Sequence, residues 1–274
     1  MTKILYSKCF ANLLTPTCRR QKELGLENKL TAETLYSKGN ILFALGENKQ
    51  ALSCLELALY NLRKVRATFL MKANCAYLLG CCQESVGQYD KAFQSLKESL
   101  TYHERANKEG NGSIKDTSRT LRRLGACHKS KKEYMKAREL FQKSLSISIP
   151  EYGPENIEIA QIHDLLAECL CLEDRDEEAL QHLLLAMKIY KIYNDPKILG
   201  RVYCLHGIIL EKIDDGLQSV INAYNLSRDQ YLSIPDKEKT DVDKIGLAST
   251  YFKLASVEDR NGRFTSASKN YLSK

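Results

Sequence analysis

The chain has 274 residues, of which 43% are hydrophobic and 27% are charged, and its formal net charge is +7. This composition is typical of a folded protein and excludes a disordered chain. The charge favours an acidic partner surface without requiring nucleic acid, and no segment approaches the roughly 18 apolar residues of a membrane-spanning helix.

The first residues and the cysteines indicate the compartment. The amino-terminal stretch carries Lys8 within its apolar part and has no small-residue cleavage site, which argues against a secretory signal. Most of the 10 cysteines fall within helical patterns, and no C-x-x-C pair occurs. We therefore expect a reduced, cytoplasmic protein.

Residues 1–30 are predicted to be a separate amino-terminal segment. Its pattern is weak, and Ile4–Leu14 could form an amphipathic helix that packs on the following residues and ends before Pro16. A regular pattern begins at Thr31 and continues to Lys274.

Six helix pairs follow one another in this region. In each pair a small residue of the first helix precedes an anchor residue of the second by twelve positions, or thirteen in the fifth pair (39/51, 80/92, 125/137, 167/179, 207/220, 255/267). Small residues let two helix backbones approach closely. The third pair, Leu121–Ser144, shows the pattern most completely, with Phe141 four positions after Ala137.

The positions of the prolines agree with the predicted helix pairs. Pro150, Pro154, Pro196 and Pro235 fall between pairs, and no proline is expected inside a helix. No segment alternates with a period of two, so we expect essentially no strand. The fold class is therefore all-α.

This ladder of glycine, alanine and aromatic residues resembles the tetratricopeptide repeat (TPR). The resemblance covers residues 31–274 and implies a single array coiled into a right-handed superhelix, or α-solenoid. Successive second-helix anchors lie 41 to 47 residues apart instead of about 34, which is similar to the longer repeats of kinesin light chains and of polarity and ciliary scaffolds. The sixth pair is incomplete at Lys274, so we expect further repeats or a second subunit to cover that end.

In the family, the first helices line a concave groove that holds a partner. The positions that flank the small residue of each first helix are the partner-binding candidates: Tyr36, Asn40, Asn74, Tyr77, Arg119, Arg122, Arg123, Lys129, Asp164, Glu168 and Arg201. Chaperone-binding members clamp a terminal carboxylate with five such residues. Asn40, Arg119 and Arg123 match that clamp, whereas two other positions do not.

Charge separates the third pair from the others. Between Arg119 and Lys143 there are nine basic residues and two acidic ones. This excess is either a solvated helix surface or an anchor for an acidic peptide, whose carboxylates arginine binds through two parallel hydrogen bonds.

Signatures of catalysis are missing from the sequence. It contains no phosphate-binding loop, no dinucleotide fingerprint and no nucleophile elbow. The five histidines are dispersed, and none pairs with another at metal-ligand spacing along the chain. We expect no enzyme activity, no cofactor and no metal.

The sequence thus predicts a scaffold or adaptor that binds a partner peptide or helix in the groove of a repeat array, and we expect the partner to be recognised through an acidic segment. One alternative is a regulatory sensor whose pitch changes when a peptide binds. A second is an RNA-binding helical repeat, which the basic third pair would serve, although Asp164 and Glu168 interrupt the charge.

Overall fold

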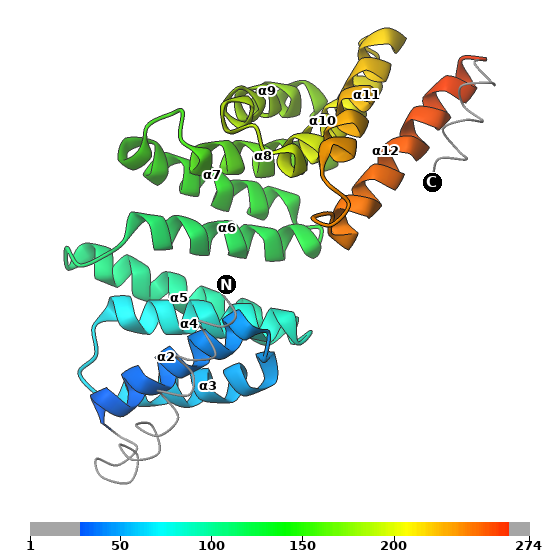
Figure 1. Cartoon of the computed structure of the whole chain (residues 1–274). Helices are drawn as coiled ribbons and strands as arrows, with labels where there is room; N and C mark the ends of the chain where they lie inside the picture. Colours follow the sequence, from blue (N-terminus) through cyan, green and yellow to red (C-terminus); the bar gives the residue numbers. More distant parts are fainter. Residues whose placement is uncertain (1–27, 263–274) are drawn as a thin grey trace. The chain divides into compact units, whose positions relative to one another are not determined.

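The structure of the protein is a computed structural model that describes residues 28–262. Those residues form α-helices joined by short turns and contain no strand (Figure 1). The helices are α2 (Lys29–Leu45), α3 (Asn48–Lys64), α4 (Phe69–Ser85), α5 (Tyr89–Lys108), α6 (Ile114–Ser130), α7 (Tyr134–Tyr152), α8 (Ile157–Leu172), α9 (Asp176–Tyr193), α10 (Pro196–Lys212), α11 (Leu217–Ser233) and α12 (Asp241–Arg260). The expected all-α class is confirmed.

The chain divides into two compact units between Lys131 and Lys132. In unit 1, α2 packs on α3, α4 packs on α3 and α5, and α6 packs on α5. In unit 2, α8 packs on α7 and α9, α10 packs on α9 and α11, and α12 packs on α11. The first, second, fourth and fifth expected pairs are therefore present. The two helices of the third pair, α6 and α7, fall in different units.

Local signals set the helix ends. The Thr240 side chain accepts a hydrogen bond from the backbone of Asp243, whose carboxylate in turn accepts one from the Thr240 backbone, so a capping box begins α12. At the other end of a helix, Gly46 closes α2 in the left-handed conformation with φ of 85°. Glycine adopts that conformation without steric cost, which explains the turn between α2 and α3.

The expected close approach of paired helices is confirmed in unit 1. A Cβ atom added to Gly39 would lie 2.6 Å from Cγ of Leu55 on α3. One added to Gly80 would lie 2.8 Å from Cγ of Leu96 on α5. Neither position has room for a side chain, so the absence of Cβ lets each helix touch its partner.

Two prolines that were expected between helices lie within them. Pro196 is the first residue of α10, where a missing N–H costs no helical hydrogen bond. Pro150 lies inside α7, two residues before that helix ends at Tyr152. A proline cannot donate to the carbonyl four residues earlier, but so near the carboxyl end only one such bond is lost. The backbone N–H of Gly153 then donates to the Ile149 carbonyl at 2.9 Å and closes the helix.

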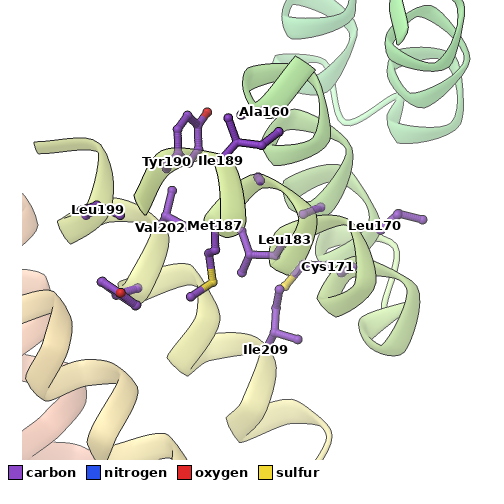
Figure 2. Packing of buried hydrophobic residues seen from close by; sticks show 14 residues of the cluster. Ala160, Leu170, Cys171, Leu183, Met187, Ile189, Tyr190, Leu199, Val202 and Ile209 are labelled. Atoms are coloured by element: carbon purple, nitrogen blue, oxygen red, sulfur yellow. The ribbon is translucent and has the colours of Figure 1, made fainter. Parts of the chain in front are cut away.

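The hydrophobic core of unit 2 lies between α8, α9 and α10. Ala167, Ala179 and Leu183, which the pattern assigned to helix contacts, are fully buried there. Figure 2 shows Leu183 and Met187 of α9 beside Val202 and Ile209 of α10. A helix of this core thus buries its apolar side chains between the preceding and the following helix, as a repeat array requires.

Two expectations lie outside the described residues: the helix at Ile4–Leu14 and the second helix of the sixth pair, with Ala267 and Tyr271. Within residues 28–262, no helix is both long enough and apolar enough to cross a bilayer.

Candidate functional site

In unit 1, first helices α2, α4 and α6 bring four of the predicted partner-binding residues into mutual range. Tyr36 comes from α2, Tyr77 from α4, and Arg119 and Arg123 from α6. We call these four residues the tyrosine–arginine face. Their proximity supports the prediction that the first helices share one surface in this unit.

Arg119 is the centre of this face. Its guanidinium carbon lies 4.6 Å from the centroid of the Tyr77 ring, and its Nη2 donates to the Asp116 carboxylate at 2.9 Å. The Arg119 side chain is 44% exposed. Burial raises the pKa of Tyr77 to about 12, so its hydroxyl keeps its proton at neutral pH. A cation on an aromatic face, open on one side to solvent, can receive an anionic group.

Arg123 lies one turn further along α6. Its Nε is 3.0 Å from the Glu84 carboxylate, and its side chain is hydrogen-bonded to the Cys81 thiol. Burial, the largest influence, raises the pKa of Cys81, which therefore stays a neutral thiol. Glu84 is thus the counter-ion of Arg123, and the two contacting atoms, Nε of Arg123 and Oε2 of Glu84, are buried.

Tyr36 is half-buried on α2. Burial raises its pKa, and the charges of Arg119 and Asp116 act on it, which places its hydroxyl near that ion pair. The face therefore offers two guanidinium groups and two phenol groups.

The other predicted residues of unit 1 are less directly involved. Asn40 is exposed on α2, and Asn74 is half-buried on α4 with an amide oxygen that makes no hydrogen bond within the described part of the chain. Arg122 and Lys129 are half-buried and make contacts of their own. Neither is among the charges that act on Tyr36 or Tyr77.

A cavity of about 390 Å³ borders the face at the carboxyl end of α6. It is lined by Glu84, Tyr89, Cys127, Ser130 and Lys131. Glu84 lines this cavity and also forms the ion pair with Arg123 of the face.

The basic excess between Arg119 and Lys143 is largely paired. Beyond Arg119 and Arg123, three of its residues form ion pairs within their own units: Lys131 with Asp90 at 3.3 Å, Lys136 with Glu133 at 3.4 Å and Arg138 with Glu173 at 3.4 Å. The pairs of Lys131 and Lys136 are exposed and contribute little to stability, whereas Arg138 and Glu173 are only 19% and 12% exposed. The surface therefore carries fewer unpaired basic side chains than the count in the sequence suggests.

In unit 2 the structure joins three more predicted residues. Both oxygens of the Asp164 carboxylate accept hydrogen bonds from the Arg201 guanidinium, and the Tyr190 hydroxyl donates to Asp164 at 3.3 Å. Asp164 is only 4% exposed. It is less available to a partner than its position in the repeat suggests, because Arg201 covers it. Glu168 lies close enough to Arg201 for its charge to act on that guanidinium.

A second cavity, of about 340 Å³, lies beside Arg201. Apart from Glu168 and Arg201, its lining comes from α10, α11 and α12, including Leu205, Ile208, Val242 and Ile245. Val242 and Ile245 are 76% and 69% exposed. This cavity is therefore more apolar than the tyrosine–arginine face.

Two histidines that are distant in sequence meet in unit 2. Nδ1 of His163 on α8 lies 2.8 Å from Nδ1 of His182 on α9, so one ring donates its proton to the other. Burial and then the neighbouring ring lower the pKa of His163 to about 4. Only the antiparallel register of α8 and α9 produces this pair, and a search of spacings along the sequence missed it. No group of three or more metal-ligating side chains occurs among residues 28–262.

The counter-ions were also missed by sequence reasoning. Asp116 could have been found, because it lies three positions before Arg119 on one helix. Glu84 could not, because it lies on α4 and comes near Arg123 of α6 only in the folded chain.

The model of the tetratricopeptide repeat family matches residues 30–105 and 116–192, which is more than half of the chain. No curated protein sequence matches the chain.

Solved structures with the same fold include BtubC (BKLC) from P. vanneervenii, with a TM-score of 0.65 at 16% identity over 82% of this chain and 85% of that one. The apo form of RapI has a TM-score of 0.65 at 14% identity over 99% and 95%. A putative kinesin light chain from Podospora anserina with nearly identical TPR-like repeats has a TM-score of 0.58 at 14% identity over 69% and 89%.

Proposed function

The chain belongs to the tetratricopeptide repeat family, and from that premise we propose that it is a non-enzymatic cytoplasmic scaffold that binds an acidic segment of a partner protein. Repeat arrays bind through rigid surfaces that several helices share. The tyrosine–arginine face has this character, since α2, α4 and α6 each contribute to it.

The observation that carries the proposal is the placement of Arg119. It lies on the Tyr77 ring and is still 44% exposed. A peptide carboxylate could replace Asp116 as its partner while the ring holds the guanidinium in place. Arg123 lies one turn away and its side chain is 38% exposed, so its outer nitrogens could bind a second acidic side chain of the partner while Nε stays with Glu84.

A charge reversal tests the proposal. Random linear peptides displayed on phage are selected against the wild-type chain, and the enriched peptides are measured for binding to the Arg119→Glu, Arg123→Glu double variant. We expect enrichment in Asp and Glu and at least a tenfold loss of affinity in the variant, because each charge-assisted hydrogen bond contributes about 1.5–3 kcal/mol.

Lys143→Glu is the matched control, because Lys143 belongs to the same basic stretch but lies on α7 in the other unit. Acidic peptides that bind the double variant as tightly as the wild type would refute the proposal.

A further inference from the structure

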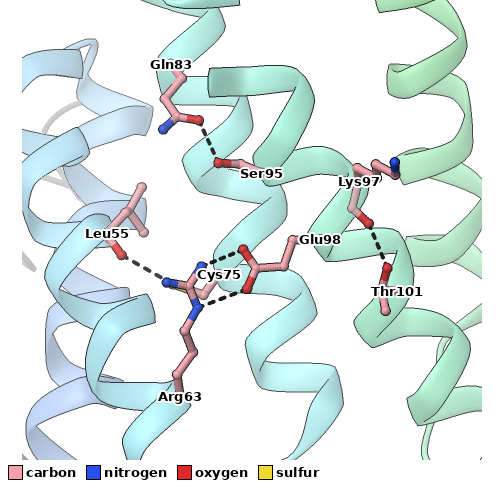
Figure 3. Close-up of polar contacts among 8 residues, drawn as sticks. All are labelled: Leu55, Arg63, Cys75, Gln83, Ser95, Lys97, Glu98 and Thr101. Atoms are coloured by element: carbon pink, nitrogen blue, oxygen red, sulfur yellow. Dashed lines mark hydrogen bonds and ion pairs between the residues drawn. The ribbon is translucent and has the colours of Figure 1, made fainter. Parts of the chain in front are cut away.

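Unit 1 has a second cleft that the tyrosine–arginine face does not use. It has a volume of about 870 Å³ and lies between the second helices α3 and α5, with α4 as its floor. Figure 3 shows its polar contacts, with Arg63 on α3, Gln83 on α4 and Glu98 on α5.

The floor combines apolar side chains with one amide. Leu59 and Leu79 are 2% and 5% exposed, and Gln83 is 4% exposed. Oε1 of Gln83 accepts a hydrogen bond of 2.7 Å from the Ser95 hydroxyl, which leaves the amide nitrogen turned away from Ser95 (Figure 3). That nitrogen has no hydrogen-bond acceptor among the described residues.

Although the residue as a whole is buried, this nitrogen is not fully enclosed and faces the cleft, where water or a ligand can reach it. Because Gln83 lines the cleft, a ligand in the cleft can supply the missing acceptor.

The charges around the cleft cancel. Its lining holds three acidic and three basic side chains: Glu56, Asp90, Glu98, Arg63, Lys91 and Lys97. Arg63 and Glu98 form a forked pair, with nitrogen–oxygen distances of 2.9 and 2.5 Å. Such a balanced rim gives no net attraction to an anion or a cation, unlike the tyrosine–arginine face.

We propose that this cleft binds an extended, uncharged segment of a partner protein. One aliphatic side chain of the segment packs against Leu59 and Leu79, and a main-chain carbonyl accepts the free hydrogen of Gln83. An extended chain presents such carbonyls at regular spacing and requires no charge to do so. Tyr60, which is 49% exposed at the rim, would cover the bound segment.

The same phage-displayed random peptides test this proposal through a different variant. Gln94 is exposed and lines the cleft, so Gln94→Trp fills the cleft from its rim without disturbing the core. We expect a class of selected peptides that contain an aliphatic residue and no excess of charge. These peptides should lose at least tenfold in affinity for Gln94→Trp and bind the Arg119→Glu, Arg123→Glu variant as tightly as the wild type.

Gln83→Leu tests the hydrogen bond itself and should weaken the same class about fivefold, the effect of one neutral hydrogen bond. Helicity and the thermal midpoint, measured by circular dichroism, show whether each variant is folded. The proposal is overturned if the folded Gln94→Trp variant binds every selected peptide as tightly as the wild type does. It is also overturned if the peptides that lose affinity are predominantly acidic or basic. Neither result affects the separate test of acidic-peptide binding at Arg119 and Arg123.

Discussion

Some residues of this protein have the same structural role in several helix pairs, whereas others make a contact that belongs to one place in the array. Gly39 and Gly80 do the same job in two pairs, whereas Arg119 on the Tyr77 ring occurs once. Residue spacing predicted which positions of unit 1 meet, because helix geometry fixes which side chains share a face. It did not predict their counter-ions or the His163–His182 contact, because those depend on how neighbouring helices are aligned.

The histidine pair predicts acid sensitivity of unit 2. The pKa of His163 is about 4 in the folded state, below its usual value near 6.5, so the unfolded chain takes up the proton first as the pH falls. Folding stability is therefore expected to fall between about pH 6.5 and pH 4. Urea unfolding followed across this range should show a smaller loss for His163→Gln, which can donate a hydrogen bond but does not titrate.

His182 and His206, the other histidines of unit 2, also have lowered pKa values, each caused first by burial, and both are retained in the two proteins. Their contributions cancel in the comparison. Identical pH dependence of the wild type and His163→Gln would contradict the assignment.

Asp164 supplies a prediction about stability. Replacing it with Ala removes the acceptor of both Arg201 and Tyr190. Arg201 is 50% exposed and can turn to solvent, so we expect a loss of about 1–3 kcal/mol in the free energy of unfolding, below the cost of a fully buried broken pair.

The matched control is Asp229→Ala, which breaks the more exposed pair with Arg228 and should cost less than about 1 kcal/mol. Equal effects of the two substitutions in urea titrations would show that the buried carboxylate is not special.

At the scale of the helix, the sequence predicted the architecture well. The small residues, the turns at Gly46 and Gly87, and the caps agree on the same helix ends, so the signals reinforce one another. Pro150 was placed wrongly, because the sequence pattern marks proline as a helix breaker while the last turn of a helix tolerates it.

Close packing of α2 on α3 predicts that Gly39→Ala destabilises unit 1. The new Cβ would lie 2.6 Å from Cγ of Leu55, which is fully buried and cannot move away easily. Overpacking typically costs about 1–3 kcal/mol. A contact this short places Gly39→Ala in the upper part of that range, about 2–3 kcal/mol, and the better helix propensity of alanine offsets about 1 of these. We expect a net loss of about 1–2 kcal/mol in urea unfolding.

Asn40→Ala, at the neighbouring exposed position, is the control and should change stability by less than about 0.5 kcal/mol. If alanine at position 39 were as stable as the wild type, close approach would not be the reason for glycine there.

On the scale of the whole molecule, the sequence identified a repeat protein but not how its surfaces differ. Unit 1 carries a face of arginine and tyrosine, whereas unit 2 has a more apolar cavity beside the Asp164–Arg201 pair. Ion pairs with acidic neighbours reduce the basic excess that the sequence shows between Arg119 and Lys143. That reduction weighs against RNA binding, which needs a continuous basic surface.

The central claim is that Arg119 and Arg123 recognise carboxylates of a partner. The most direct test measures one selected acidic peptide and its Asp/Glu-to-Lys counterpart against the wild type and the Arg119→Glu, Arg123→Glu variant, at low and high salt. We predict that the acidic peptide prefers the wild type, that the lysine counterpart prefers the variant, and that salt weakens both preferences. If the acidic peptide binds both proteins equally and the lysine counterpart binds neither, these arginines do not form the binding site.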